Sequence, residues 1–400
     1  MNGLWLVLIV GLGLPVYAFL GYPVLLFVFA AVVQVARDVS YLTCRRDRRV
    51  DSPAVPGVSV IIAAHNEEGV IRRCLTHALD LDYPADSLEI LLGSDGSTDG
   101  TVEAAESVSD SRVRLIAFTS RRGKLAVIKD CVSRARGEIL VFTDANTALA
   151  PDAVRNLLRH FGNPMVGAVC GELHLLAPDG TSVEEGLYWR YEKVLKVLES
   201  RLNAVLGANG AIYAVRHSLF PSIPEGTITE DFVIPMSVRA RGYRVVYDPE
   251  AAATEEAPAQ LSGEFRRRVR IGAGNWHALG QCWRLLLPWK GFVALSFWSH
   301  KVLRWFTPFL LAAALGVAVA LAREPAGRVA LAVQGVAYGA AALGFALRRL
   351  RLPAGPLGLA AYFVTINAAI GVGMIRGLLG LQRASWPPTA RGPIPTGGKR

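Results

Sequence analysis

Four polar clusters in the middle of the chain contain residue types that can bind a nucleotide or move a proton. The clusters are Ala63-Ala64-His65-Asn66-Glu67, Ser94-Asp95-Gly96-Ser97, Thr143-Asp144-Ala145-Asn146 and Thr229-Glu230-Asp231. Asp144 and Asn146 are two residues apart, so at the end of a strand their oxygen atoms point the same way and can bind one hard divalent cation. Asp231 opens a predicted helix, where its carboxylate can act as a general base on an acceptor hydroxyl.

Each cluster also has a structural interpretation as a turn or a helix cap. Asn66 is expected to cap the helix that follows it, and Ser97 or Asp99 would cap the next one. Acids such as Glu230 and Asp231 are favoured in the first turn of a helix. No single cluster decides between the two interpretations, whereas their order along the chain favours a nucleotide site.

Alternating strands and helices must position these clusters. Short apolar runs at 58–63, 88–92, 113–118 and 138–143 are typical of strands, and the segments 67–79, 99–108 and 124–135 of the helices between them. This alternation predicts a doubly wound α/β sheet, whose ligands bind at the carboxyl ends of the strands. Farther along, we expect strands at 166–176, 211–215 and 244–247, and helices at 183–202, 231–241 and 261–281.

The two ends of the chain are apolar enough to enter a membrane. Hydrophobic residues make up 52% of the sequence, and the segment 4–36 contains no charged residue. That segment is longer than the ~20 residues that cross a bilayer. Pro15 and Pro23 interrupt it, which predicts either a kinked span or a span with an interfacial turn. A cleaved signal peptide fits less well, because no basic residue precedes the apolar run. Near the other end, we expect an interfacial helix at 292–306 and spans at 305–321, 329–347 and 357–379.

Basic residues indicate the orientation of the chain. Arg37 and the cluster at 45–49 follow the first apolar segment, and such residues mark the cytosolic side. The net charge is +10, and many of the basic residues lie beside apolar segments. This placement favours contact with an anionic bilayer over binding of nucleic acid. The five cysteines include no C-x-x-C pair and are expected to be free thiols. The side of the C-terminal tail stays open, because three spans would place it outside whereas its basic residues favour the inside.

These patterns predict five parts: a membrane anchor at 1–36, a basic linker at 37–57, a cytosolic catalytic domain at 58–284, an interfacial helix with about three spans at 285–380, and a flexible basic tail at 381–400. Together with the four clusters, this order resembles glycosyltransferase family 2, and within it the membrane-embedded cellulose, hyaluronan and poly-N-acetylglucosamine synthases. The resemblance covers roughly 58–305. It implies an α/β GT-A fold, which is a Rossmann-like doubly wound sheet, with transmembrane helices on both sides in sequence.

The resemblance also implies a donor site for a nucleotide-diphosphate-sugar, usually linked to UDP. The residues that would bind the donor are Ala63, His65, Glu67, Asp95, Lys124, Asp144 and Arg267. Asp95 would contact the base or the ribose, and Lys124 matches the donor-side lysine of the family. Asp144 and Asn146 occupy the metal motif, which would take Mg²⁺ or Mn²⁺. The family usually has an acid at the second position, so Asn146 is a departure.

The catalytic side of the resemblance rests on two further motifs. Glu230 and Asp231 match the threonine-glutamate-aspartate motif, with Asp231 as the catalytic base. Arg270 matches the arginine of the glutamine-x-x-arginine-tryptophan motif and would hold the diphosphate. In that motif Arg267 replaces the glutamine and Ile271 replaces the tryptophan. Because that tryptophan lines the acceptor site of processive synthases, processive synthesis and single addition both stay open.

The resulting hypothesis is an inverting membrane glycosyltransferase at the plasma (inner) membrane. Its acceptor would be a polysaccharide or a lipid-linked sugar used in cell-envelope or exopolysaccharide synthesis. The alternative is a catalytically impaired membrane scaffold of a polysaccharide-assembly complex, which Asn146 keeps open. A transporter is not favoured, because about four spans are available and none carries an obvious buried ion pair.

Overall fold

The computed structural model describes residues 3–44, 55–176, 187–256, 261–350 and 352–382. The basic cluster at 45–49, the first residues of the helix expected at 183–202, and the tail from 383 onward lie outside the described residues. The chain divides into two compact units. The first comprises Met1–Val28, Gln260–Gly280 and Ala294–Gln382, and the second comprises Phe29–Ala259, Gln281–Val293 and Arg383–Arg400.

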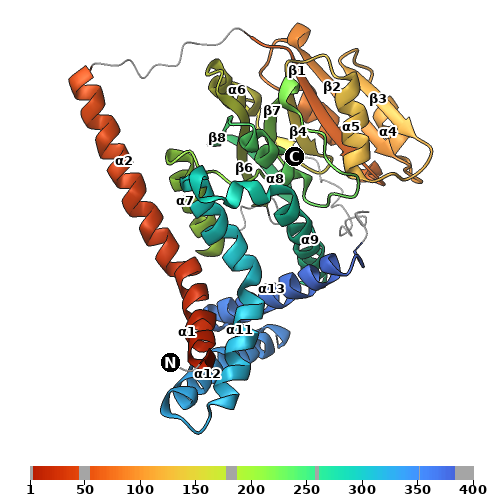
Figure 1. Ribbon diagram of the computed structural model, residues 1–400. Helices are drawn as coiled ribbons and strands as arrows, with labels where there is room; N and C mark the ends of the chain where they lie inside the picture. The colour runs from red at the N-terminus through yellow and green to blue at the C-terminus, as the bar shows by residue number, and fades with distance from the viewer. Residues whose placement is uncertain (1–2, 45–54, 177–186, 257–260, 351, 383–400) are drawn as a thin grey trace. The chain divides into compact units, whose positions relative to one another are not determined.

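The second unit is built on one eight-stranded sheet with the order β3-β2-β1-β4-β7-β6-β8-β5 (Figure 1). Its strands are β1 (Val58–Ala64), β2 (Leu88–Asp95), β3 (Val113–Phe118), β4 (Ile139–Asp144), β5 (Ala148–Leu149), β6 (Val166–Leu176), β7 (Tyr213–Arg216) and β8 (Arg244–Glu256). The first four strands are parallel. Strand β7 lies antiparallel to both β4 and β6, β8 runs parallel to β6, and β5 lies antiparallel to β8. The sheet is therefore mixed, and only its first half has the all-parallel arrangement expected from strand–helix alternation.

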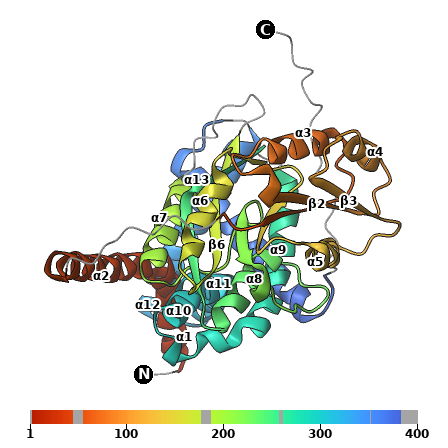
Figure 2. The same cartoon turned by 90° about the horizontal axis from the view of Figure 1, so that it is seen from above.

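Helices cover both faces of the parallel half. They are α3 (Glu68–Leu79), α4 (Thr101–Glu106) and α5 (Lys124–Arg134), followed in the chain by α6 (Ala153–Leu158), α7 (Leu187–Arg201) and α8 (Glu230–Ala240). Figure 2 shows α3 and α4 on one side of β2 and β3, and α5 on the other side. Strand β1 is buried throughout, as expected for a β-branched run covered on both faces. Gly93 on β2 lets α5 come close, because a Cβ placed there would lie 2.2 Å from Val127 Cγ1.

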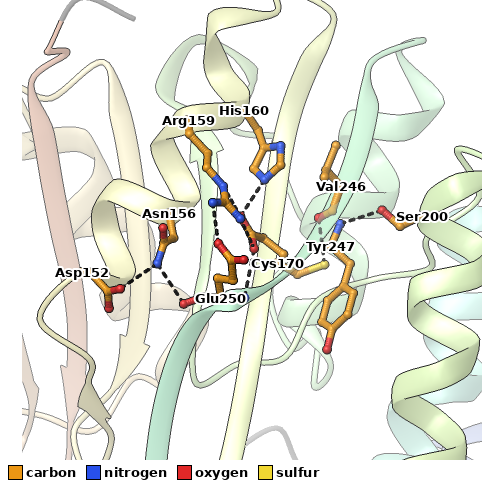
Figure 3. Close-up of polar contacts among 10 residues, drawn as sticks. Asp152, Asn156, Arg159, His160, Cys170, Ser200, Val246, Tyr247 and Glu250 are labelled. Atoms are coloured by element: carbon orange, nitrogen blue, oxygen red, sulfur yellow. Dashed lines mark hydrogen bonds and ion pairs between the residues drawn. The ribbon is translucent and has the colours of Figure 1, made fainter. Parts of the chain in front are cut away.

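A buried acid on β8 ties this strand to the segment that follows α6. The pairing of β6 with β8 slips between Cys170 and Glu172, and Asp248 lies in the irregular stretch. Its carboxylate accepts two hydrogen bonds of 2.8 Å from Arg159 and one of 2.7 Å from His160 Nε2. Figure 3 shows the two donor side chains, Arg159 and His160, next to each other. Burial alone would raise the pKa of Asp248, but these bonds and the charge of Arg159 lower it below its usual value. These bonds therefore tie β8 to the segment after α6.

Four helices among the described residues are long and apolar enough to cross a membrane: Gly3–Thr43, Phe292–Ala320, Pro325–Arg349 and Gly355–Leu378. The first runs through α1 (Gly3–Val16), a π-helical segment (Tyr17–Gly21) and α2 (Tyr22–Cys44). The irregularity expected from Pro15 and Pro23 thus takes the form of a π-helical insertion, since a proline removes a backbone donor. The second joins α10 (Phe292–Ser296), another π-helical segment (Phe297–Val302) and α11 (Leu303–Ala320). The expected interfacial helix and the span after it therefore form one continuous helix.

In the first unit, the basic helix α9 (Leu261–Cys282) packs closely on α13 (Gly355–Leu378), which follows α12 (Pro325–Arg349). A Cβ placed on Gly373 would lie 2.2 Å from Val269 O and 2.8 Å from Gly272 Cα. Only glycine leaves room for backbones at this separation. The crossing fixes the helix that carries Arg267 and Arg270 onto an apolar helix.

Candidate functional site

The carboxyl ends of the parallel strands bring three of the four predicted clusters to one edge of the sheet. Ala63 on β1 is in register with Asp144 at the end of β4. Ala64 is in register with Ser94 near the end of β2. The segments that begin at His65, Asp95 and Ala145 therefore leave the sheet side by side, which is where open α/β sheets bind their ligands.

The loops after β1 and β2 are tied to each other. Asn66 has a positive φ of 56°, and its Oδ1 accepts a hydrogen bond of 2.8 Å from Thr98 N. Glu67 N donates to Thr101 Oγ1 at 2.8 Å, and His65 Nδ1 lies 2.7 Å from Asp95 O. The expectation that Asn66 caps α3 is wrong: Glu67 occupies the N-cap position, and the Asn66 side chain joins the loops instead.

Asp95 holds the start of α5. Its buried carboxylate accepts a hydrogen bond of 2.6 Å from Arg122 N and one of 2.9 Å from Gly123 N. Gly123 has a φ of 93°, a conformation that favours glycine. Lys124 is the first residue of α5, so these two bonds set where its side chain begins. The predicted contact of Asp95 with the base or ribose stays a prediction.

Lys124 joins two acids that come from distant parts of the sequence. Its Nζ lies 2.7 Å from Asp144 Oδ1 and 2.8 Å from Glu230 Oε1. The Glu230 side chain is 8% exposed and that of Asp144 is 33% exposed, so one carboxylate is buried and the other can reach a ligand. Burial alone would lower the pKa of Lys124, but the charges of Asp144 and Glu230 raise it well above its usual range. The ammonium therefore stays charged at any physiological pH.

Asp231 has the properties of a proton acceptor near neutral pH. Burial raises its pKa to about 6, the charges of Glu230 and Asp144 act in the same direction, and the charge of Lys124 opposes them. A base with such a pKa is mostly ionised at neutral pH and still accepts protons readily. Its Oδ1 accepts a hydrogen bond of 3.0 Å from Phe232 N, and its backbone O accepts one of 2.9 Å from Ala208 N.

The backbone bond from Ala208 brings in a loop that the sequence-based search for site residues missed. A Cβ placed on Gly210 would lie 3.4 Å from Asp231 Oδ2 and 3.7 Å from Asp144 Oδ2. Gly210 thus borders the space between the two carboxylates. Tyr213 follows, fully buried, with its ring stacked on Phe142 at a centroid distance of 4.7 Å. The Gly-Ala-Asn-Gly run at 207–210 is a turn signal that could have pointed to this loop.

The remaining predicted residues divide between the two units. Asn146 follows Asp144 in the second unit and is half-buried. Among the residues that the structure describes, no group of three His, Cys, Asp or Glu side chains forms a complete metal cage. Arg267 and Arg270 lie on α9 in the first unit, where Arg267 Nη1 is 3.9 Å from Glu264 Oε2. Their roles at the donor stay predictions.

Comparisons with known proteins agree with the expected family. Residues 59–220 match the sequence profile described as Glycosyl transferase family 2. The chain is 25% identical over 270 residues to a poly-β-1,6-N-acetyl-D-glucosamine synthase of Staphylococcus aureus (strain MSSA476), which is 64% of this chain and 65% of that protein. The identity to the synthase of Staphylococcus epidermidis is 25% over 232 residues, or 56% of each chain.

A solved structure shares the fold. It is a mannosyltransferase from Pyrobaculum calidifontis in complex with GDP-mannose and Mn²⁺, with a TM-score of 0.70 and 23% identity over 94% of this chain and 100% of that one. The expected GT-A fold is thereby confirmed, and the profile match supports the expected resemblance to the family. Residues 59–220 match glycosyl transferase family 2, in a chain that has the GT-A fold and resembles poly-β-1,6-N-acetyl-D-glucosamine synthases.

Proposed function

We propose that this protein is an inverting glycosyltransferase that moves a sugar from a nucleotide-diphosphate donor to an acceptor at a membrane. The observation that carries the proposal is the Lys124–Asp144–Glu230 bridge beside Asp231, because it places a cation and a metal-type acid next to the proposed base. The donor would be a UDP- or GDP-sugar: the curated relatives are named for a polymer of N-acetylglucosamine, and the structural neighbour binds GDP-mannose.

In the proposed reaction, Asp231 takes the proton of an acceptor hydroxyl, whose oxygen attacks the anomeric carbon of the donor sugar. The bond from that carbon to the diphosphate breaks as the new one forms, so a single displacement inverts the anomeric centre. Lys124 and Arg270 would hold the negative charge of the departing diphosphate. An α-linked donor should therefore give a β-linked product, and an α-linked product would contradict this mechanism.

The residues at the edge also suit a divalent cation. Asp144 and Asn146 are hard oxygen donors two positions apart, and a site with few protein ligands is usual when substrate phosphates supply the others. Asp144 and Asn146 would hold Mg²⁺ or Mn²⁺, and the bound cation would neutralise diphosphate charge. Mn²⁺ accompanies the donor in the structural neighbour.

The acceptor would be a growing polysaccharide or a lipid-linked sugar. Four apolar helices support a place in the membrane, and the basic residues after the first of them support a cytosolic catalytic domain at the plasma (inner) membrane. The replacement of a tryptophan by Ile271 leaves processive synthesis and single addition as two outcomes for product analysis.

The test is donor turnover by the purified full-length protein in nanodiscs. A panel of UDP- and GDP-sugars is supplied with Mn²⁺, Mg²⁺ or EDTA, with native lipid extract as acceptor. We expect cation-dependent release of one nucleotide, reduced by about 10²- to 10⁴-fold in Asp231→Asn. The matched control is Asp86→Asn, at an exposed acid of the same unit, which should keep full activity. A folded protein that turns over no donor would favour the scaffold alternative, whereas an Asp231→Asn variant with full activity would refute Asp231 as the catalytic base.

A further inference from the structure

Lys124 occupies an unusual position for a residue that is expected to bind a diphosphate. Its ammonium contacts Asp144 Oδ1 at 2.7 Å and Glu230 Oε1 at 2.8 Å. Asp144 is the acid that the proposed function assigns to the divalent cation. The expected metal ligand is therefore paired with a positively charged side chain of the protein itself.

An ammonium and a divalent cation cannot both bind Asp144 without mutual repulsion. With Lys124 on Oδ1, a cation on Oδ2 would lie within a few ångströms of a like charge, where repulsion is large at a partly buried site. The other acids that face this site, Glu230 and Asp231, cannot offset the repulsion fully, because Glu230 is itself paired with Lys124. Lys124 and the metal thus compete for one carboxylate.

The donor can resolve this competition. A nucleoside diphosphate is strongly anionic, and the four-carbon stem of a lysine lets its ammonium move to a new partner. Asp144 and Lys124 are 33% and 24% exposed, so ligand phosphates can approach the pair from the edge of the sheet. When the ammonium moves to the diphosphate, Asp144 becomes available to the cation.

We propose that Lys124 is the resident counter-ion of Asp144 and exchanges with the divalent cation when the diphosphate binds. This inference rests on the proposed function for the identity of the ligands. Lys124 thereby sets the order of binding: the free enzyme holds the cation weakly, and the nucleotide and the cation strengthen each other. Such coupling is reciprocal, so the cation raises nucleotide affinity by the same factor.

The test measures Mn²⁺ binding to the full-length protein in detergent, using the electron paramagnetic resonance signal of free Mn²⁺. Without nucleotide, Lys124→Gln should bind Mn²⁺ at least tenfold more tightly than the wild type, since the competing charge is gone. Addition of UDP or GDP should tighten Mn²⁺ binding by tenfold or more in the wild type and by a smaller factor in Lys124→Gln. No sugar donor is present, so turnover does not enter the measurement.

Three variants make the outcome specific. Lys129→Gln removes a lysine of the same helix whose Nζ bonds Ile223 O, and it should bind Mn²⁺ like the wild type. Lys124→Arg keeps the charge and should also bind weakly without nucleotide. Asp144→Asn should abolish the specific binding in every background. Thermal unfolding of each variant verifies that it is folded. If Lys124→Gln does not fold, Mn²⁺ binding by Lys124→Arg tests the inference.

Two results would overturn the inference: nucleotide-free Mn²⁺ binding by Lys124→Gln that is equal to or weaker than that of the wild type, or tight binding by Lys124→Arg. The first would mean that the lysine merely orients Asp144. These results are separate from a failure of the proposed function, which would appear as absent sugar transfer with the Mn²⁺ competition still present.

Discussion

Replacing Asp231 by Asn should make the protein more stable while it strongly slows sugar transfer. The pKa of Asp231 is raised to about 6, first by burial and then by the nearby charges of Glu230 and Asp144. The folded state therefore disfavours the ionised carboxylate. An asparagine has the shape of the protonated acid, cannot ionise, and can still accept the hydrogen bond from Phe232 N.

The size of the effect follows from the pKa shift. The rise from 3.8 to about 6 is roughly two pH units, and each unit corresponds to about 1.36 kcal/mol. The upper bound is thus about 3 kcal/mol, and the partial exposure of the side chain reduces it, because water screens the neighbouring charges. We expect a gain in unfolding free energy of about 1–3 kcal/mol above pH 7.

The pH dependence has a definite sign. In the wild type, ionised Asp231 costs unfolding free energy, and this cost is complete above the folded pKa of about 6. The cost falls to about half at pH 5 and disappears below the unfolded pKa near 4. The difference between variant and wild type should therefore be largest at pH 8 and shrink on acidification.

The assay compares thermal unfolding of the two proteins in the same detergent with EDTA, at pH 8, 6 and 5. Asp86→Asn, at an exposed acid, serves as the control and should not change the unfolding temperature at any pH. A variant that is less stable than the wild type at pH 8, or a difference that does not change with pH, would refute the assignment of a raised pKa to Asp231.

Other changes test the fold and the metal motif. Gly93→Ala should cost about 1–3 kcal/mol of unfolding free energy by overpacking, because its Cβ would lie 2.2 Å from Val127 Cγ1; in chemical denaturation, Val127→Ala should relieve part of this cost. Asp248→Asn should cost about 1–3 kcal/mol at pH 7, because it weakens a buried carboxylate's bonds to Arg159. Because the pKa of Asp248 is lowered, the stability that its carboxylate contributes is present above pH 4 and is lost on further acidification. Below pH 4, the wild type and Asp248→Asn should therefore become equally stable. Asn146→Asp should lower the Mn²⁺ concentration that gives half-maximal transfer, since a carboxylate binds hard cations more tightly than an amide, and an unchanged value would remove residue 146 from the metal motif.

The sequence by itself was sufficient for the elements whose residues interact mainly with near neighbours or with any apolar surroundings. The expected strands at 113–118 and 166–176 match β3 and β6, because their short apolar runs, bounded by turn residues, are typical of strands. The long apolar helices were equally readable, since length and hydropathy alone decide whether a helix can span a bilayer. The predicted start of α5 at Lys124 was also correct, because Gly123, directly before it, favours a turn over a helix.

Pairings between distant segments were not readable from local sequence. Nothing in the local pattern of residues 213–216 shows that β7 lies between β4 and β6 and is antiparallel to both. This insertion is what brings Gly210 to the space between Asp144 and Asp231. Strand pairing depends on which apolar faces meet in three dimensions, and a short strand satisfies several pairings equally well.

The site itself shows the same division. The motif residues identified Lys124, Asp144, Glu230 and Asp231 as members of one chemistry, but their types could not show that Lys124 bridges Asp144 and Glu230. The raised pKa of Asp231 likewise depends on burial beside two other acids, which only the folded chain creates. Residue type determines which charges a site can contain, whereas the distance and solvent exposure that set their interaction energies are decided by tertiary structure.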